Sequence, residues 1–155
     1  MTMTLREATV KDLDRMLELL NQIDLIDING VRKKASFEAS RDIYSKVLTE
    51  IQTDPNNEVL VGLVGGEIVA MIQMTYIPGL FFGTNLRAMA EDVRIAEGMR
   101  GQGLGKQLMT LVFERAKQRG CKIFQLTTND WRTDPIAFYK KLGMKHTHVG
   151  LRINL

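Results

Sequence analysis

The stretch Arg100-Gly101-Gln102-Gly103-Leu104-Gly105-Lys106 decides how this chain is organised. It joins a segment with the pattern of a strand, Ala88 to Ala96, to a segment with the pattern of a helix, Gly103 to Gln118. Glycine lets the backbone approach a ligand closely. The first N–H groups of a helix and the positive end of its dipole attract anions, and Arg100 and Lys106 add positive charge. The stretch therefore predicts a binding site for a pyrophosphate.

The glycine spacing separates this stretch from two common phosphate-binding motifs. Gly101, Gly103 and Gly105 run G-x-G-x-G, whereas the dinucleotide fingerprint needs G-x-G-x-x-G and the P-loop needs G-x-x-x-x-G-K-[ST]. The competing interpretation is a glycine-rich helix entry without a ligand. The stretch does fit Arg/Gln-x-x-Gly-x-Gly/Ala, and here the chain resembles the GCN5-related N-acetyltransferases, whose segment holds the pyrophosphate of acetyl coenzyme A. The resemblance implies cofactor contacts from Arg100, Gly101, Gln102, Gly103, Leu104, Gly105 and Lys106.

Composition limits the class of protein. The chain has 155 residues, of which 45% are hydrophobic and 25% charged, so we expect one soluble domain over residues 1–155. We expect a cytoplasmic location, because Cys121 is the single cysteine and neither a signal-peptide pattern nor a membrane-length apolar run occurs. The net charge of +3 is spread along the chain and predicts neither a nucleic-acid nor a membrane partner. His146 and His148 lack an evident third ligand, so no metal site is expected.

Hydrophobic periodicity predicts alternating strands and helices around this stretch. Gly65-Gly66 separates two β-rich segments and predicts a hairpin turn. Further strands are expected at Leu5–Ala8, Glu58–Val64, Glu67–Tyr76, Cys121–Thr128 (of the buried type) and Met144–Leu155, the last as one strand or a bent pair of strands. Further helices are expected at Val10–Gln22, from a Ser36 cap to Asp54, and after an Asp134 cap to Leu142, with Ile23–Lys34 as a loop, alone or with a short turn of helix. The order predicts an α/β fold (α+β mixed), a mixed central sheet with helices on both faces, and it is also similar to the acetyltransferase fold.

The resemblance also implies how the rest of the cofactor is held. In the family, the strand before the glycine turn splays from its neighbour, and pantetheine lies in that gap, bonded to exposed strand backbone. The corresponding positions here are Val93, Arg94 and Ile95. The resemblance further implies that the N–H of Ile95, or of its neighbour, polarises the thioester carbonyl.

Glu91 is the candidate general base. Amide formation from a thioester needs a neutral amine, a polarised carbonyl and a proton for the departing thiolate. The run from Glu91 to Ile95, nine residues before Arg100 at its start, is similar to the polyamine acetyltransferase branch, where the equivalent glutamate passes the amine proton through water. Glu91 and Asp92 point in opposite directions on a regular strand, so one of them faces the cleft, and we favour Glu91. The competing interpretation is a solvated charge at a strand edge.

Tyr139 is the candidate general acid. The segment from Ile136 to Gly143 resembles the family's [AI]-x-x-[FL]-Tyr-x-x-x-Gly-[FM] pattern, in which the tyrosine hydroxyl donates a proton as thiolate leaves. A phenol stays protonated at neutral pH and can donate, although helical spacing alone would favour a packing role. The family often has an asparagine seven residues before this tyrosine, at the pantetheine arm. That position is Arg132 here, and Asn129 lies three residues earlier, so both stay candidates.

These features together predict a function. We expect an acetyl coenzyme A-dependent N-acetyltransferase acting on a primary amine of a small molecule by direct attack in a ternary complex. Asp24, Asp27, Glu91 and Asp92 could attract such a cation. The alternatives are a protein or peptide N-acetyltransferase and a non-catalytic acyl coenzyme A-binding module. The apolar C-terminal residues, Leu151, Ile153 and Leu155, further predict a homodimer.

Overall fold

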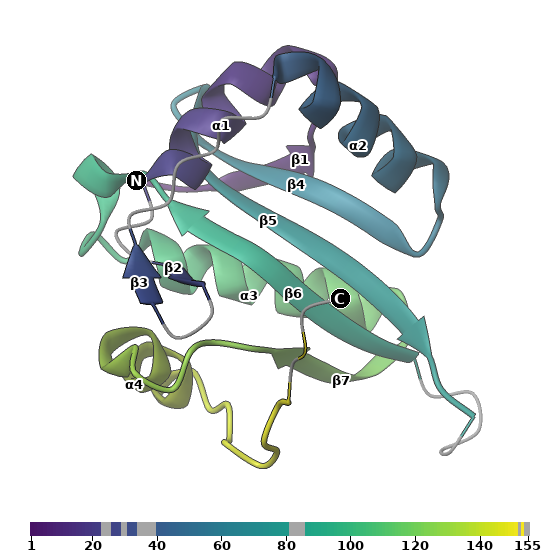
Figure 1. Ribbon diagram of the computed structural model, residues 1–155, viewed down its shortest axis with the longest axis vertical. Coiled ribbons are helices and arrows are strands. Elements are labelled where there is room, and N and C mark those ends of the chain that lie inside the picture. Colours follow the sequence, from purple (N-terminus) through teal and green to yellow (C-terminus); the bar gives the residue numbers. More distant parts are fainter. Residues whose placement is uncertain (23–25, 29–30, 34–39, 81–85, 152, 154–155) are drawn as a thin grey trace. The chain divides into compact units, whose positions relative to one another are not determined.

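The architecture is built on a five-stranded sheet in the order β1-β4-β5-β6-β7 (Figure 1). The structure is a computed structural model that describes residues 1–22, 26–28, 31–33, 40–80, 86–151 and 153. Neighbouring strands are antiparallel from β1 to β6, and the arrows of β6 and β7 run in the same direction in Figure 1. The predicted mixed sheet is therefore confirmed. Its strands are β1 (Thr4–Glu7), β4 (Asn57–Val64), β5 (Glu67–Pro78), β6 (Leu86–Ile95) and β7 (Cys121–Leu126).

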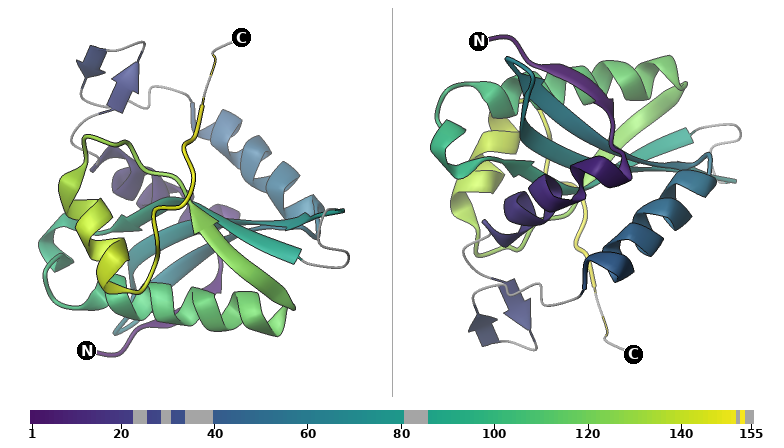
Figure 2. Two further views of the ribbon diagram at one scale, coloured as in Figure 1. Left: turned by 90° about the horizontal axis from the view of Figure 1, so that it is seen from below. Right: turned by 90° about the horizontal axis from the view of Figure 1, so that it is seen from above.

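Helices cover both faces of this sheet, as predicted. Figure 2 shows α1 (Leu13–Asn21) and α2 (Arg41–Thr53) on one face and α3 (Leu104–Gln118) on the other. The last helix is α4 (Thr133–Lys141). The chain divides into two compact units, Met1–Gln125 with the sheet and α1 to α3, and Leu126–Leu155 with α4. The single domain over residues 1–155 stays a prediction.

Apolar side chains on both faces of the central strands β4 and β5 and on one face of α3 form the core of the first unit. The hairpin between β4 and β5 turns at Gly65 and Gly66, whose φ angles of 60° and 88° confirm the predicted turn. In α3 the apolar stripe comes from helical spacing. The largest fully buried side chains of this core include Leu60, Ile72, Met74, Leu104, Leu108, Met109 and Val112.

A buried polar cluster fixes α3 to the sheet. Glu58 of β4 is 5% exposed and accepts hydrogen bonds from Arg115 of α3, at 2.8 Å to Oε1 and 2.6 Å to Oε2. The hydroxyl of Tyr76 on β5 also donates to Glu58, and the Arg119 guanidinium lies 4.0 Å from the Tyr76 ring centroid. Although burial opposes it, these hydrogen bonds hold the pKa of Glu58 below its usual value. Because both partners are satisfied, the cluster orients α3 and hence the glycine turn at its start.

The described residues of the predicted loop Ile23–Lys34 lie in strands, which corrects that prediction. The described residues form two short antiparallel strands, β2 (Ile26–Ile28) and β3 (Val31–Lys33). The sequence joins these strands by Asn29-Gly30, a dipeptide typical of hairpin turns between β-branched residues. The loop prediction gave more weight to the polar residues than to this pattern.

The predicted C-terminal strand, Met144–Leu155, is wrong for the described residues. Met144–Leu151 and Ile153 contain no strand. Alternation alone does not make a strand, since a strand needs a partner for its backbone hydrogen bonds. The side chains of Val149, Leu151 and Ile153 are 83%, 96% and 80% exposed. Their exposure motivates the homodimer, which stays a prediction.

Three smaller boundaries also differ from those predicted. The N-cap of α2 is Ser40, whereas the predicted cap Ser36 lies outside the described residues. α4 begins one residue before its predicted cap Asp134, with Arg132 as the N-cap. β7 ends at Leu126 and is not fully buried, because it lies at the edge of the sheet and Ile123 is 42% exposed.

Asp12 is a buried acid at the entry to α1, and its replacement should cost stability. The residue is 8% exposed and binds Arg6 through two hydrogen bonds of 2.7 and 2.8 Å. These bonds, opposed by burial, lower the pKa of Asp12 from 3.8 to about 2. We expect Asp12→Asn to reduce the free energy of unfolding by about 2 kcal/mol at neutral pH.

The sign of this effect gives the pH dependence. A carboxyl with a lowered pKa in the folded state contributes stability above the unfolded value of 3.8, and that contribution disappears as the pH falls through about 2. Urea unfolding of both proteins should therefore converge near the lower value. Asp14→Asn is the control, because the Asp14 side chain is 73% exposed in its ion pair with Arg41 and exposed pairs contribute about 0–1 kcal/mol. Equal losses in both variants would contradict the assignment.

Candidate active site

The glycine turn before α3 has a backbone conformation that residues with a side chain rarely adopt. Gly101 and Gly103 have φ angles of 76° and 79°. A Cβ atom built at either position meets no other heavy atom within 4 Å. The glycines are therefore required by backbone conformation, and open space lies over both of them. Such space is what a ligand that approaches the backbone closely would need.

The N-cap residue of α3 offers no side-chain acceptor to the first N–H groups of the helix. Its N-cap is Gly103, which has no side chain to accept a hydrogen bond. The first intrahelical bond runs from the N–H of Gln107 to the carbonyl of Gly103, at 3.2 Å. The N–H groups of Leu104, Gly105 and Lys106 precede that bond and have no intrahelical partner. With the dipole of a helix spanning Leu104–Gln118, they have the donors and the partial positive charge that an anion-binding site needs.

Arg100 and Gln102 hold the turn in place. The guanidinium of Arg100 donates to the carbonyl of Ile95 at 3.2 Å and to the carbonyl of Gln22, after α1, at 3.0 Å. Gln102 donates through Nε2 to the carbonyl of Gly98 at 3.1 Å. Arg100, predicted as a charge beside the ligand, thus also ties the turn to the end of β6.

A bulge interrupts β6 at the predicted catalytic segment. Met71 pairs with Arg94 and Gln73 pairs with Glu91, so Ile72 lies opposite both Asp92 and Val93. Asp92 has a φ of 48°, the single positive value among the non-glycine residues that the structure describes. The alternation of side chains between the two sheet faces, which was expected to separate Glu91 from Asp92, therefore ends at Glu91.

Both acids at this bulge are exposed, but they differ in their surroundings. Asp92 accepts a hydrogen bond from Arg94 at 3.3 Å, which pairs its charge with a guanidinium. Glu91 lies on the regular part of β6, on the same strand face as Met89. The regular pairing of β5 with β6 therefore fixes the direction of the Glu91 side chain.

The backbone of Ile95 points away from β5. The N–H of Ala96 donates to the carbonyl of Val69 at 2.8 Å, and Ala70 lies opposite Ile95. Hydrogen-bonded and non-hydrogen-bonded pairs alternate along an antiparallel ladder. The N–H of Ile95 is therefore directed to the other side of β6, where β7 is the neighbouring strand. A donor on this side of β6 is what a ligand bound along the strand would need.

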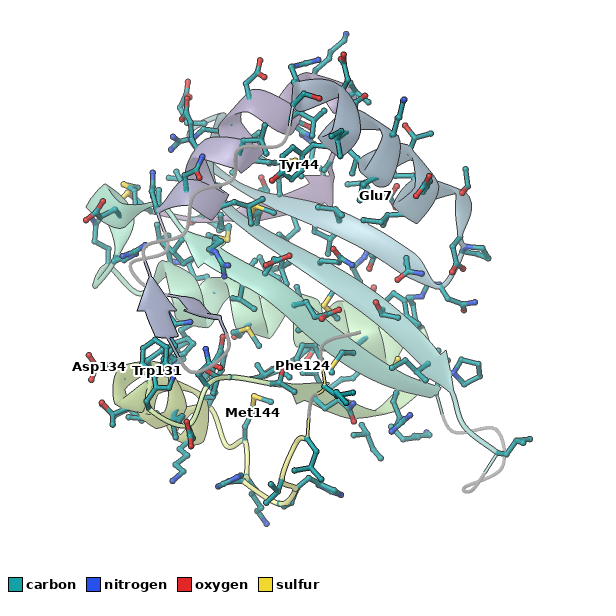
Figure 3. All side chains as sticks on the ribbon, viewed as in Figure 1. Glu7, Tyr44, Phe124, Trp131, Asp134 and Met144 are labelled. Atoms are coloured by element: carbon teal, nitrogen blue, oxygen red, sulfur yellow. The ribbon has the colours of Figure 1, made fainter. Side chains whose placement is uncertain are left out.

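The remaining predicted residues belong to the second unit. Tyr139 is half-buried on α4, and its ring packs against that of Phe138 with centroids 5.2 Å apart. The N–H of Arg132 donates to the carbonyl of Asn129 at 3.0 Å, in the turn that precedes α4. Figure 3 marks Trp131 and Asp134 beside this turn. Asn129 is exposed and Arg132 half-buried, so both side chains stay candidates for the pantetheine arm.

Other features bear on the predicted chemistry. A cavity of about 240 Å³ lies between α3 and β7, where the rings of Phe113 and Phe124 meet edge to face (Figure 3 labels Phe124). Another cavity, of about 270 Å³, lies beside β4. Neither cavity is lined by a predicted site residue. Within the described ranges, no three metal-binding side chains cluster. None of the helices described here has the length and apolarity to cross a bilayer.

Sequence reasoning missed the residues that only the folded backbone brings together. The bulge at Asp92 and the Glu58–Arg115 contact had no signal in the sequence beyond the residues themselves. Asp24 lies outside the described residues, and the same holds for the side chain of Asp27, so their proposed attraction for a cation stays a prediction.

Comparisons with known proteins place acetyltransferases among the relatives of this chain. A model of the acetyltransferase (GNAT) family matches residues 19–144. The aminoalkylphosphonate N-acetyltransferase of Salmonella typhimurium is 29% identical over 144 residues, which cover 93% of this chain and 86% of that protein. The thialysine N-epsilon-acetyltransferase of Sus scrofa is 24% identical over 148 residues, which cover 91% and 83%. A solved structure from Bacillus halodurans C-125, described as a transcriptional regulator, is 39% identical with a TM-score of 0.82 over 99% of both chains.

Proposed function

Because the chain belongs to the acetyltransferase (GNAT) family and is an N-acetyltransferase, we propose that it transfers the acetyl group of acetyl coenzyme A to the primary amine of a small molecule. The transfer occurs by direct attack in a ternary complex. The observation that carries this proposal is the uncapped start of α3 behind Gly101 and Gly103, where amide donors and open space meet.

The residues of the turn fit a pyrophosphate. The N–H groups of Leu104, Gly105 and Lys106 would bind its oxygens, and the Lys106 side chain is exposed beside them. Val93, Arg94 and Ile95 would bind the pantetheine arm along β6, with Asn129 or Arg132 as a further contact. Acetyl coenzyme A supplies an activated acetyl thioester when bound.

The chain's own groups would then serve the three needs of amide formation. The N–H of Ile95 polarises the acetyl carbonyl, since it points away from the β5 ladder. Glu91 accepts, through water, a proton of the bound ammonium, and the neutral amine that results attacks the carbonyl carbon. Tyr139 donates a proton to the departing thiolate. The named amine acceptors of the two curated relatives support an amine as the acceptor.

Replacing Gly103 by aspartate tests the cofactor site. The new carboxylate would stand at the start of α3, where it repels a pyrophosphate and occupies the open space over the turn. We expect the affinity for acetyl coenzyme A, measured by calorimetry, to fall at least tenfold, or about 1.4 kcal/mol.

Two further variants separate charge from backbone strain. Gly103→Asn has nearly the same shape and the same φ requirement without the charge, so it should retain more affinity than Gly103→Asp. Gly66→Asp introduces the same side chain at a φ of 88° with no neighbour within 4 Å, but in the β4–β5 hairpin, and should bind as the parent does. Unchanged affinity in a folded Gly103→Asp protein would refute the proposed cofactor site.

A further inference from the structure

Arg87 of β6 has a buried guanidinium nitrogen, Nε, without a hydrogen-bond partner among the described residues. No ion pair of Arg87 occurs in the described ranges. A shielded polar nitrogen left unpaired costs folding free energy, and such a group in a native protein calls for an explanation. A ligand with an acceptor group would supply the missing partner.

Arg87 shares its face of the sheet with the proposed base. The ladder is regular from Leu86 to Glu91, and it pairs Arg87 with Ile77, Met89 with Thr75 and Glu91 with Gln73. Side chains alternate along a strand, so Arg87, Met89 and Glu91 point to one side. The bulge at Asp92 begins only after this run, and therefore does not change their common direction.

This side is the face opposite α3. Ala88 and Ala90, which alternate with those residues, are 0% and 2% exposed. Ala88 lies opposite Tyr76, which binds Glu58 together with Arg115 of α3. The alanines thus pack on the α3 side, and Arg87 and Glu91 point to the other side.

The residues around Arg87 on that face are polar or half-exposed. Gln73, Thr75 and Met89 are half-buried, and Gln125 of β7 donates to the sulfur of Met89 at 3.7 Å. The amide and hydroxyl groups of this surface offer hydrogen bonds to a small hydrophilic molecule beside the proposed base. In the regular run from Leu86 to Glu91, Arg87 is the cation that faces this way and Glu91 the anion, and Arg94, opposite Met71 beyond the bulge, lies on the same face and pairs with Asp92.

We propose that Arg87 binds an anionic group, a phosphonate or a carboxylate, on an acceptor whose amine lies at Glu91. This inference rests on the proposed function and names the acceptor class as zwitterionic amines. The Cα atoms of Arg87 and Glu91 are about 13 Å apart at a strand rise of about 3.3 Å per residue, and two long side chains that reach inward from both ends leave room for a short linker. A guanidinium binds either anion through paired N–H donors.

The test compares acceptors that differ only in the acid. Aminoethylphosphonate, β-alanine and ethanolamine present the same amine with a phosphonate, a carboxylate and a hydroxyl. We expect kcat/KM of the parent protein for the better acidic amine to exceed that for ethanolamine at least tenfold, and the preferred acid identifies the anion. Arg87→Met should remove this preference, mainly through KM, and leave ethanolamine within about twofold; Arg87→Lys should retain part of it.

Two controls separate recognition from structure. Arg87→Met should unfold thermally no earlier than the parent protein, because the guanidinium loses no partner in the folded chain. Arg41→Met removes an exposed guanidinium paired with Asp14 on another element and should leave the acid preference unchanged. A loss of thermal stability with an equal loss for all acceptors would assign Arg87 to packing and overturn the inference.

Further outcomes distinguish this inference from the proposed function. A parent protein that acetylates ethanolamine as well as the acidic amines would overturn the role of Arg87 and leave the proposed function intact. If no amine is acetylated, the proposed function fails, and calorimetry with ethylphosphonate and propionate decides the inference. Binding by the parent protein that is lost in Arg87→Met would support the anion site, and absence of binding would overturn it.

Discussion

Tyr139→Phe is expected to lower the turnover number by about 10²–10⁴-fold, the range typical for loss of a general acid. The substitution removes the hydroxyl and keeps the ring that packs against Phe138 on α4. The thermal midpoint and the affinity for acetyl coenzyme A should therefore change little. Steady-state release of the free thiol, measured with saturating amine, provides the turnover number.

The pH profile and a matched variant sharpen this prediction. If Tyr139 is the acid, the alkaline limb of the parent's pH–rate profile should be missing in Tyr139→Phe. Tyr44→Phe removes the hydroxyl of another half-buried tyrosine, on α2 (labelled in Figure 3), and should retain parental turnover. Parental turnover in Tyr139→Phe would return this tyrosine to a packing role in α4.

Glu91→Gln is expected to lower activity by a comparable factor, but mainly at low pH rather than at high pH. An amine acceptor is mostly protonated below its own pKa, and Glu91 removes the proton that blocks attack. Without this base, only the small fraction of free amine reacts, so kcat/KM should fall by about 10²-fold or more below neutral pH. The deficit should shrink as the pH rises toward the pKa of the amine.

The control for Glu91 is Glu67→Gln, an exposed glutamate at the start of β5. This variant should follow the parental profile at every pH. A Glu91→Gln profile parallel to that of the parent would show that the carboxylate does not accept the amine proton. Asp92→Asn then tests the neighbouring acid, whose ion pair with Arg94 predicts a smaller effect.

The sequence predicted the parts of the fold that local residue types specify. Gly65-Gly66 and Gly103 dictate backbone conformations that few other residues adopt, so the hairpin and the start of α3 were predicted at the right places. The helix predicted from Gly103 to Gln118 likewise matches α3, whose buried residues lie at helical spacing. These signals depend on a few neighbouring residues, and the folded chain does not change them.

The parts that were missed depend on partners distant in sequence. The alternation of Leu151 and Ile153 is typical of a strand, but no described strand pairs with them. The bulge at Asp92 arises from the register between β5 and β6, which the sequence of β6 alone does not specify. No sequence pattern singles out Arg87 from the other charged residues. Its proposed role follows from its buried Nε, which has no described partner, and from the sheet face that it shares with Glu91.

The most direct test of the proposed reaction is a single-turnover mass measurement with excess protein over acetyl coenzyme A. In a direct transfer, the acetyl group should stay on the coenzyme until an amine is added, and then appear on the amine with an equal amount of free thiol. The protein itself, including Cys121, should keep its mass throughout. Acetylation of the protein before the amine is added, or bound acetyl coenzyme A that no amine discharges, would contradict direct transfer in a ternary complex.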